Sequence, residues 1–289
     1  MRWSKARALV LGLPWLLTFA LFWLYPIVYS LIIGFTDKQL LSPERHWVGL
    51  DNYRSLLSDP AFIASLKNTF IFVVGTIPFT TVIALALALL VNREFRGRGV
   101  FRSGYFLPSI TSMVVIALIF TNLYQRGGYI AYLASLAGLS VPEHGFLYSD
   151  STALYSIMAM DVWMAVGYYM LIFLAGLKSI PGELYESAAV SGAGRIRQFF
   201  SITLPLLRPV GLFIVVINSI KSFQVFVEIF VMTKGKFDTS TMVYFIYETG
   251  LTTKFQFGYA SAAAYILFVI IAVFAAAQFW LFRRKQVVW

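Results

Sequence analysis

Six long apolar runs constrain the fold of this 289-residue chain more than any other feature. A helix of about 20 apolar residues is long enough to cross a bilayer. Backbone polar groups in lipid must be hydrogen-bonded within their own segment, so each run is predicted to be helical. The chain is therefore predicted to be an all-α membrane protein with six transmembrane helices. The runs cover residues 9–35, 69–91, 103–125, 152–177, 206–232 and 259–282.

The composition agrees with this class and excludes several others. Of the residues, 59% are hydrophobic and only 12% are charged, against roughly 25% charged residues in a soluble domain. Cysteine is absent, which excludes disulfides and thiolate metal sites. His46 and His144 lie in different predicted loops, so no metal site is expected. No G-x-x-x-x-G-K-[ST] phosphate loop is present, and the chain is expected to bind no ATP, to hold no cofactor and to catalyse no reaction itself.

The distribution of basic residues predicts the orientation. If the N-terminus lies inside, the inner segments hold 14 of the Lys and Arg residues and the outer segments hold eight. The positive-inside rule then predicts that both termini, and the loop after the fourth run, are cytoplasmic. This distribution does not suggest nucleic-acid binding. The inner set is Arg2, Lys5, Arg7, Arg93, Arg96, Arg98, Arg102, Lys178, Arg195, Arg197, Arg208, Arg283, Arg284 and Lys285.

The polar segment 182–205 separates the fourth and fifth runs. Its sequence predicts a short helix, a tight break at residues 192–194, and a second helix. Small side chains would let another surface approach the backbone closely. Arg195 and Arg197 follow the break and favour the cytoplasmic side.

This segment resembles the EAA loop of ABC-importer permeases. Residues at that family's spacing are Glu186, Ala188, Gly192, Ile202, Leu204 and Pro205. Ser187 stands where the family has its first Ala, and Ser191 stands where it often has Asp. In the family this loop is a coupling helix that docks into the ATP-hydrolysing subunit. The resemblance implies that role for Glu186, Ser187, Ala188, Ala189, Gly192 and Ala193, although any cytoplasmic loop can hold such residues.

Further strings extend the resemblance from about Leu13 to Arg283. They are Gly49–Tyr53, Arg102–Pro108, Phe223–Phe226 and Phe257–Ala262. The pattern is similar to the maltose and glycerol-phosphate type of carbohydrate ABC permease. It implies the type I permease fold, with residues 1–289 as one transmembrane domain that carries the coupling loop 182–205. It also implies a prokaryotic plasma (inner) membrane location.

The resemblance implies partners as well. A second, related permease subunit would complete the pathway as a heterodimer, surrounded by membrane lipid. Two ATP-binding subunits would hold ATP and Mg, and an extracytoplasmic solute-binding protein would deliver the solute.

Three ionisable side chains fall within predicted helices: Asp161, Lys221 and Glu228. Each costs about 2.5–3.5 kcal/mol at the centre of a membrane helix on insertion scales, so such residues normally face the protein interior. The helical rise places Asp161 and Lys221 at similar depths. An ion pair between them is the favoured expectation. A Lys221 that binds an anionic solute is the alternative.

Helical periodicity groups these residues with others into two faces. A polar face on an apolar helix must line something other than lipid. In the maltose-type family the sugar lies between the corresponding helices, so both faces are predicted to bind substrate. Hydrogen bonding between helices is the alternative. The faces comprise Asp161, Met164, Ala165 and Tyr168 in the fourth run, and Asn218, Lys221, Ser222 and Val225 in the fifth.

The main interpretation is a permease subunit of an ATP-driven importer for a sugar or sugar derivative. The same machinery could carry an anionic sugar, a sugar phosphate, a polyol or an oligosaccharide. An ion-coupled secondary transporter that uses Asp161 or Lys221 as a relay is an alternative from another class. A membrane scaffold without transport is disfavoured by the polar faces.

Overall fold

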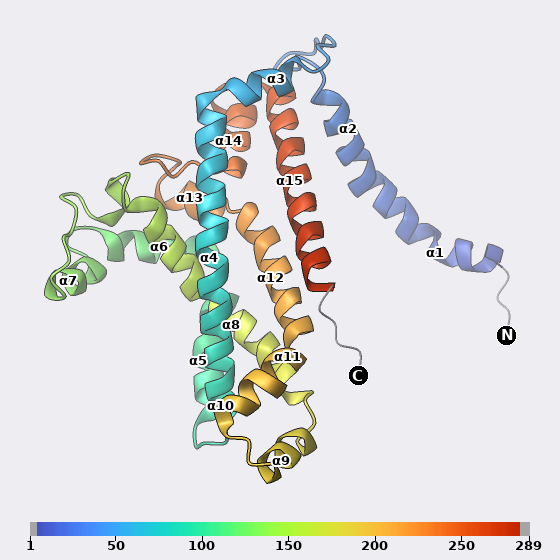
Figure 1. Ribbon diagram of the computed structural model, residues 1–289. Helices are drawn as coiled ribbons and strands as arrows, with labels where there is room; N and C mark the ends of the chain where they lie inside the picture. Colours follow the sequence, from blue (N-terminus) through green and yellow to red (C-terminus); the bar gives the residue numbers. More distant parts are fainter. Residues whose placement is uncertain (1–4, 284–289) are drawn as a thin grey trace. The chain divides into compact units, whose positions relative to one another are not determined.

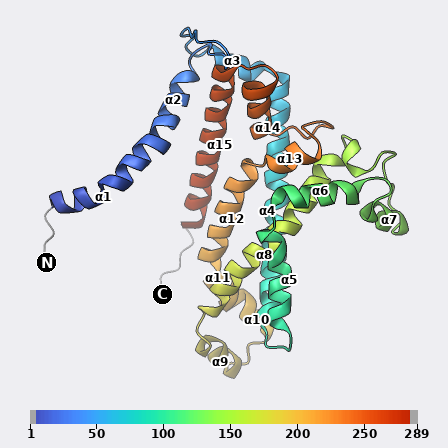
Figure 2. The ribbon, with the colours of Figure 1, turned by 180° about the vertical axis from the view of Figure 1, so that it is seen from behind.

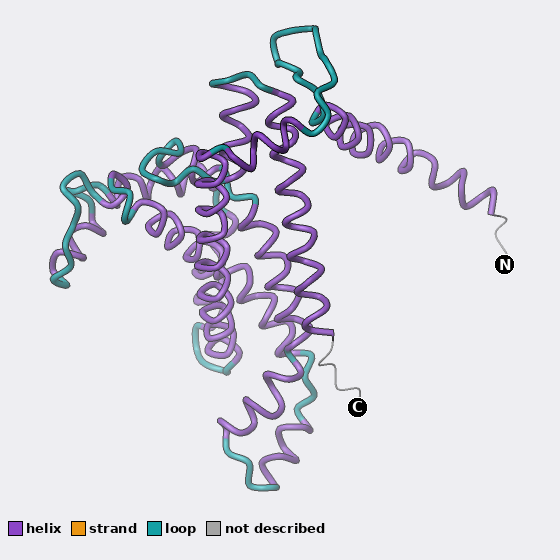
Figure 3. The backbone as a smooth tube through the Cα atoms, turned by 45° about the horizontal axis from the view of Figure 1, so that its top comes forward, coloured by secondary structure: helices purple, strands orange, loops and turns teal. Residues whose placement is uncertain are grey.

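A computed structural model describes residues 5–283 of the chain, and helix dominates them. Figure 3 shows the helices joined by loops, and the only β-structure of the described residues is two isolated bridges. The chain forms two compact units. The first comprises Met1–Ile63 and Phe245–Val269, and the second comprises Ala64–Tyr244 and Ile270–Trp289. Arg2, Arg284 and Lys285, which entered the orientation argument, lie outside the described residues.

The first unit begins with a long apolar helix where the first run predicts one. It consists of α1 (Lys5–Phe19), a π-helical turn η1 (Ala20–Leu24) and α2 (Tyr25–Ile33). Pro26 lies in the first turn of α2, directly after the π-helical turn, and it lacks the N–H that would continue the hydrogen bonding of that turn. Only 6% of the span Val10–Ile33 is buried. The unit also contains α3 (Asp51–Ser58), the π-helical η4 (Glu248–Thr252) and the first part of α15 (Phe257–Arg283).

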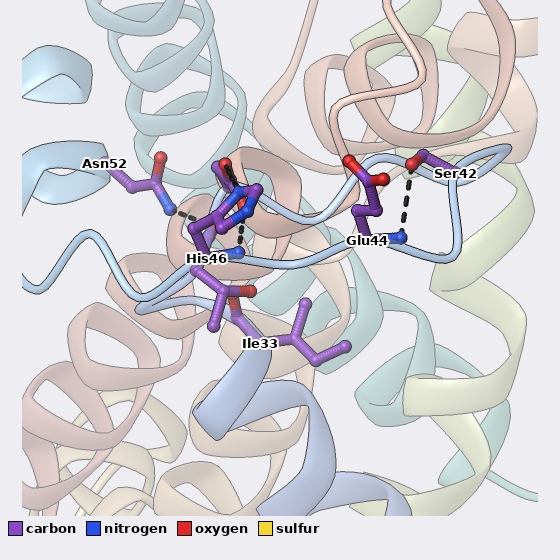
Figure 4. A network of polar contacts seen from close by, with 7 residues as sticks. Ile33, Ser42, Glu44, His46 and Asn52 are labelled. Carbon is purple, nitrogen blue, oxygen red and sulfur yellow. Dashed lines mark hydrogen bonds and ion pairs between the residues drawn. The ribbon is translucent and has the colours of Figure 1, made fainter.

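Asn52 holds the loop that follows α2. Its Nδ2 donates to the carbonyl oxygens of Gly34 and Thr36, both at 2.9 Å, and Figure 4 shows the surrounding network. The hydroxyl of Thr36 donates to the Ile33 carbonyl at 2.9 Å. The last carbonyls of a helix lack partners within the helix, so these bonds stabilise the end of α2. The string Gly49–Tyr53 therefore has a structural role in this chain.

His46 and Asp37 interact within the same loop. His46 Nδ1 lies 3.0 Å from Asp37 Oδ2, and the backbone N–H of His46 donates to Asp37 Oδ1 at 2.5 Å. The side-chain hydrogen bond and the negative charge of Asp37 raise the pKa of His46. The backbone and side-chain hydrogen bonds from His46 lower the pKa of Asp37.

We expect Asp37→Asn to lower the pKa of His46 toward its ordinary value of 6.5. A raised His pKa stabilises the folded loop below pH 6.5, and this contribution is lost as the pH rises through the folded-state pKa. The lowered Asp pKa stabilises it above pH 3.8 and is lost as the pH falls through the folded-state pKa. NMR titration of the imidazole measures the shift, with His144 resonances as an internal control. An identical His46 titration in both proteins would contradict the expectation.

The second unit contains most of the helices (Figures 1 and 2). They are α4 (Pro60–Asn92), α5 (Arg98–Ile110), α6 (Met113–Tyr124), α7 (Tyr129–Leu136), η2 (Phe146–Tyr148), α8 (Ala153–Lys178), α9 (Glu183–Val190), α10 (Arg195–Gln198), η3 (Phe199–Thr203), α11 (Leu204–Leu206), α12 (Arg208–Phe223) and α13 (Val227–Met232). The helix α14 (Met242–Tyr247) continues into the first unit.

The prediction of an all-helical membrane fold is confirmed. Among the described residues, five helices or helix pairs are long and apolar enough to cross a membrane, and a sixth results if α5 and α6 form one span. The predicted runs 152–177 and 259–282 agree with α8 and α15 within a few residues. The run 69–91 lies within α4, which starts at Pro60. Which side of the membrane the termini occupy stays a prediction.

The apolar pattern predicted one helix over residues 103–125. The structure has two helices there instead. The helix α5 ends at Ile110, and α6 leaves it at an angle of 97°. Pro108 and the hydroxyl groups after it explain the break: Ser109 Oγ donates to the Phe106 carbonyl at 2.7 Å, and Thr111 Oγ1 donates to the Leu107 carbonyl at 2.9 Å. These bonds pair carbonyl groups that the end of α5 would otherwise leave unpaired.

The run 206–232 is interrupted as well. The helix α12 ends at Phe223, and α13 begins at Val227. Thr241 Oγ1 donates to the Val225 carbonyl at 3.1 Å and pairs a backbone group that the interruption exposes. Non-helical backbone at membrane depth is tolerated where it is buried in protein or lines a cavity. Both interruptions of the second unit therefore predict a cavity beside them.

The helices α5 and α8 approach each other closely. A Cβ atom added to Gly167 of α8 would lie 1.8 Å from the carbonyl oxygen of Tyr105 in α5. Small residues allow such close approach in membrane proteins, where packing rather than water exclusion holds helices together.

Candidate functional site

A cavity of about 520 Å³ lies beside the two helix interruptions of the second unit. Parts of α4, α8 and α12 line it, together with the junctions between α5 and α6 and between α12 and α13. All eight residues of the two predicted faces surround this cavity: Asp161, Met164, Ala165, Tyr168, Asn218, Lys221, Ser222 and Val225. The two faces therefore meet at one space. That they bind a solute stays a prediction.

Tyr168 and Lys221 are in contact in the wall of the cavity. The Lys221 Nζ lies 5.0 Å from the centroid of the Tyr168 ring. A cation over the face of a tyrosine is attracted by the ring, by about 0.5–2 kcal/mol. Tyr168 is 39% exposed and lines the cavity, so its ring can also contact a ligand.

Lys221 does not form the ion pair with Asp161 that the depths of the two residues predicted. Among the described residues, no carboxylate oxygen lies within 4.0 Å of the Lys221 Nζ. Glu228 lines the same cavity and lies in the first turn of α13, where a negative charge is favoured by the helix dipole. The cavity wall thus carries one basic and two acidic side chains that are separate from one another.

Two buried polar groups of the cavity wall have no hydrogen-bond partner among the described residues. They are the Nδ2 of Asn218, a residue 3% exposed, and the hydroxyl of Tyr169, a residue 1% exposed. Buried polar groups are normally hydrogen-bonded, because a missing bond costs about 1–3 kcal/mol. Ser222 differs, since its Oγ lies 3.2 Å from Thr76 Oγ1. Asn218 and Tyr169 therefore carry unpaired buried polar groups in the cavity wall.

The two predicted polar faces did not include the other residues that line the cavity. Glu228 was predicted to lie nearer the outer end of its helix and was not part of the predicted face, but it lines the cavity. Ser109 and Met113 belong to the span 103–125, which was predicted to be one straight helix. The hydroxyl-bearing residues after Pro108 were the sequence signal that could have indicated a break. The further lining residues are Phe72, Ser109, Met113, Tyr169, Gln224, Phe226, Val227 and Glu228.

This set of groups suits the binding of a hydroxyl-rich molecule. The carboxyl groups accept hydrogen bonds, the Lys, Asn and Tyr groups donate them, and the aromatic rings offer apolar faces. The described residues include no cluster of three or more His, Cys, Asp or Glu side chains that could hold a metal ion. The two serines of the lining bond to other groups: Ser109 Oγ donates to the Phe106 carbonyl, and Ser222 Oγ lies 3.2 Å from Thr76 Oγ1. The site can bind and release a molecule, and nothing in it suggests bond breaking.

The predicted coupling loop forms two helices around a turn. The helix α9 holds Glu183 and Glu186 in its first turn, where the dipole favours acidic residues. The helix ends in a Schellman motif: the Gly192 N–H donates to the Ala189 carbonyl, and the Ala193 N–H donates to the Ala188 carbonyl, both at 2.9 Å. The motif needs a left-handed residue after the helix, and Gly192 supplies it with φ of +79°.

Most of this loop is exposed. Leu184, Val190 and Ile196 are 41%, 91% and 78% exposed, and Glu186, Ser187, Ala189 and Gly192 are exposed beside them. The hydroxyl of Tyr185 lies 2.8 Å from Thr203 Oγ1, and this hydrogen bond anchors α9 to the segment that follows the turn. A rigid exposed helix with apolar side chains is suited to docking on another protein.

Known proteins resemble this chain over nearly its whole length. The chain is 33% identical to the probable ABC transporter permease protein YesP of Bacillus subtilis, over 94% of this chain and 91% of YesP. It is 31% identical to the arabinooligosaccharides transport system permease protein AraP of the same organism, over 93% of this chain and 86% of AraP.

A solved structure resembles the fold. It is a chain of a bacterial alginate ABC transporter in complex with an alginate pentasaccharide-bound periplasmic protein. The TM-score is 0.82 and the sequence identity is 25%, over 96% of this chain and 95% of that one. The family described as binding-protein-dependent transport system inner membrane component matches residues 80–287. The chain therefore belongs to this family and is a multi-pass inner-membrane transport subunit, not an enzyme.

Proposed function

We propose that this chain is a permease subunit of an ATP-driven importer for a neutral, hydroxyl-rich sugar or oligosaccharide. It forms half of the translocation pathway, and the cavity beside α8 and α12 is part of that pathway. Family membership argues against an ion-coupled carrier and against a scaffold. The observation that carries the proposal is the convergence of both polar helix faces on one cavity.

The charges around the cavity favour an uncharged solute. Two acidic side chains, Asp161 and Glu228, and one basic side chain, Lys221, line the cavity, so basic groups are in the minority there. Carboxylates are strong acceptors for sugar hydroxyls, and a hydrogen bond to a charged group contributes about 1.5–3 kcal/mol. Among the described residues, the Asn218 amide and the Tyr169 hydroxyl of the cavity wall have no hydrogen-bond partner. AraP, which is similar to this chain, is named for the transport of arabinooligosaccharides.

An anionic sugar is the second candidate. Among the described residues, Lys221 has no carboxylate partner within ion-pair distance. A similar solved structure is of a transporter involved in the import of the acidic polysaccharide alginate. In this case the ammonium group would contact a carboxylate of the solute. A sugar phosphate would fit the same group, and a polyol would fit the neutral alternative.

The remaining partners follow from the family and the loop geometry. A solute-binding protein delivers the solute, as the periplasmic protein in the similar alginate transporter complex suggests. A second, related permease subunit completes the pathway, and two ATP-binding subunits supply ATP and Mg. The exposed helix α9 docks on an ATP-binding subunit, with Glu186, Ser187, Ala188, Ala189, Gly192 and Ala193 at the contact. This places the loop and both termini in the cytoplasm, as the basic residues predict.

Uptake by variants of the reconstituted importer tests the solute class. If the solute is neutral, Asp161→Asn should lower uptake about ten- to a hundredfold, because it weakens a charged hydrogen bond of about 1.5–3 kcal/mol. Lys221→Met should then have the smaller effect. If the solute is anionic, the order reverses, and Lys221→Met abolishes uptake.

The solute for this experiment is chosen by a thermal-shift screen of the solute-binding protein with neutral oligosaccharides and uronic-acid oligosaccharides. Lys178→Met is the matched control, since Lys178 ends α8 outside the cavity. Wild-type uptake by both the Asp161 and the Lys221 variant would rule out the cavity as the solute site.

A further inference from the structure

Lys221 brings a positive charge into the lining of the cavity. Its Nζ lies 5.0 Å from the centroid of the Tyr168 ring, which is within the range of a cation–π interaction. Among the described residues, no carboxylate oxygen comes within 4.0 Å of this Nζ. Asp161 and Glu228 line the same cavity. The ammonium group therefore lies over an aromatic ring although acidic side chains share its cavity.

The position of Tyr168 on α8 separates this contact from Asp161. The two residues are seven positions apart in the sequence, so they share one helix face, two turns from each other. At 1.5 Å per residue, their backbones differ in level by about 10 Å along the helix axis. The Tyr168 ring thus gives the ammonium group a partner two helical turns from Asp161.

Both members of this contact are supported by their surroundings. The Tyr168 ring packs edge-on against the Tyr169 ring, with centroids 5.2 Å apart and an interplanar angle of 74°, and Tyr169 is 1% exposed. Lys221 lies in the last turn of α12, where the helix dipole favours a positive charge. The next residue, Ser222, has its Oγ 3.2 Å from Thr76 Oγ1 of α4. This hydrogen bond joins the end of α12 to α4.

We propose that Tyr168 is a positioning residue that holds the Lys221 ammonium group away from Asp161, an inference that rests on the proposed function. A lysine paired with Asp161 would occupy carboxylate oxygens that otherwise accept hydrogen bonds from the hydroxyl groups of the solute. With the ammonium group over the ring, these oxygens stay open to the solute. The ring therefore acts on transport through Lys221, and not only through the surface that it offers to a ligand.

Uptake by the reconstituted importer tests this role, with the neutral oligosaccharide that the thermal-shift screen selects. Tyr168→Leu removes the ring and should lower uptake about two- to thirtyfold, the range that a cation–π contact controls. Tyr168→Phe keeps the aromatic face and should retain most of the uptake. Addition of Lys221→Met to Tyr168→Leu should restore uptake to the level of Lys221→Met alone, because no ammonium group then remains to pair with Asp161. A ring that acts only by packing, or only by contact with the solute, gives no such rescue.

Ring fluorination tests the same role with little change in packing, and it decides alone if Tyr168→Leu does not assemble. Phenylalanines with increasing numbers of ring fluorines replace Tyr168 and progressively weaken the attraction of the ring face for a cation. Uptake should fall stepwise along this series when Lys221 is present and should stay constant in the Lys221→Met background. Tyr155→Leu is the matched control, since Tyr155 is an exposed residue of α8 outside the cavity lining, and it should show wild-type uptake.

Equal losses from Tyr168→Leu with and without Lys221→Met would overturn the inference, and so would uptake that does not respond to fluorination. Abolished uptake in Lys221→Met alone would instead refute the neutral solute of the proposed function, and the inference with it. Wild-type uptake by both Asp161→Asn and Lys221→Met would refute the cavity as the solute site. The variants of Asp161 and Lys221 therefore decide on the proposed function before the ring variants decide on Tyr168.

Discussion

Replacement of Gly167 by Ala should sharply destabilise the folded chain, and Gly167→Leu should abolish the recovery of folded protein. The added Cβ would lie 1.8 Å from the Tyr105 carbonyl oxygen. That atom belongs to the backbone of α5 and cannot rotate away as a side chain does. The helices α5 and α8 would have to separate, at a cost at or above the upper end of the roughly 1–3 kcal/mol typical of overpacked cores.

Gly104→Ala is the matched control for this prediction. Gly104 lies in α5, and a Cβ added there would meet no atom within 4 Å. Alanine is favoured over glycine in a helix by about 1 kcal/mol, so this variant should be neutral or slightly more stable. Thermal unfolding of the purified proteins in the same detergent measures both. Equal melting temperatures of the Gly104 and Gly167 variants would show that the close approach of α5 and α8 does not hold in the protein.

Apolar run length and periodicity predicted the long helices from sequence. The helices α8 and α15 agree with their predicted runs because a helix is the only way to pair the backbone of a continuous apolar segment in lipid. The same reasoning failed at residues 103–125, since a hydropathy pattern does not register a break whose carbonyl groups are paired by Ser109 and Thr111. The contact of Gly167 with α5 was not predicted, because it depends on which helices are neighbours.

The residues of the cavity were likewise predicted only in part from the sequence. Periodicity correctly brought Asp161 and Lys221 to one space, since side chains at i, i+3 and i+4 share a helix face. It did not predict that Lys221 lies over the Tyr168 ring rather than against a carboxylate. That choice depends on side-chain direction and on the interruption after Phe223, which moves Glu228 into the cavity. Depth along a helix axis alone cannot decide between such partners.

Replacement of Gly192 by Val should uncouple or release the ATP-binding subunits while the chain still folds. Gly192 has φ of +79°, and a Cβ added there would meet no atom within 4 Å. The penalty is therefore backbone strain alone, about 1–2 kcal/mol for a non-glycine residue in the left-handed region, and more for a β-branched one. The Schellman bonds from Gly192 and Ala193 would break, and α9 would lose its fixed end.

Two variants separate this backbone effect from a loss of contact surface. Gly194 also lies in open space, but its φ of −67° and ψ of 165° are extended and suit any residue, so Gly194→Val should keep near wild-type coupling. Asn tolerates the left-handed region, so Gly192→Asn should retain most activity. The measurements are solute uptake and binding-protein-stimulated ATP hydrolysis in proteoliposomes. Equal damage from Val at both glycines would mean that bulk at the docking surface, rather than the turn at Gly192, controls coupling.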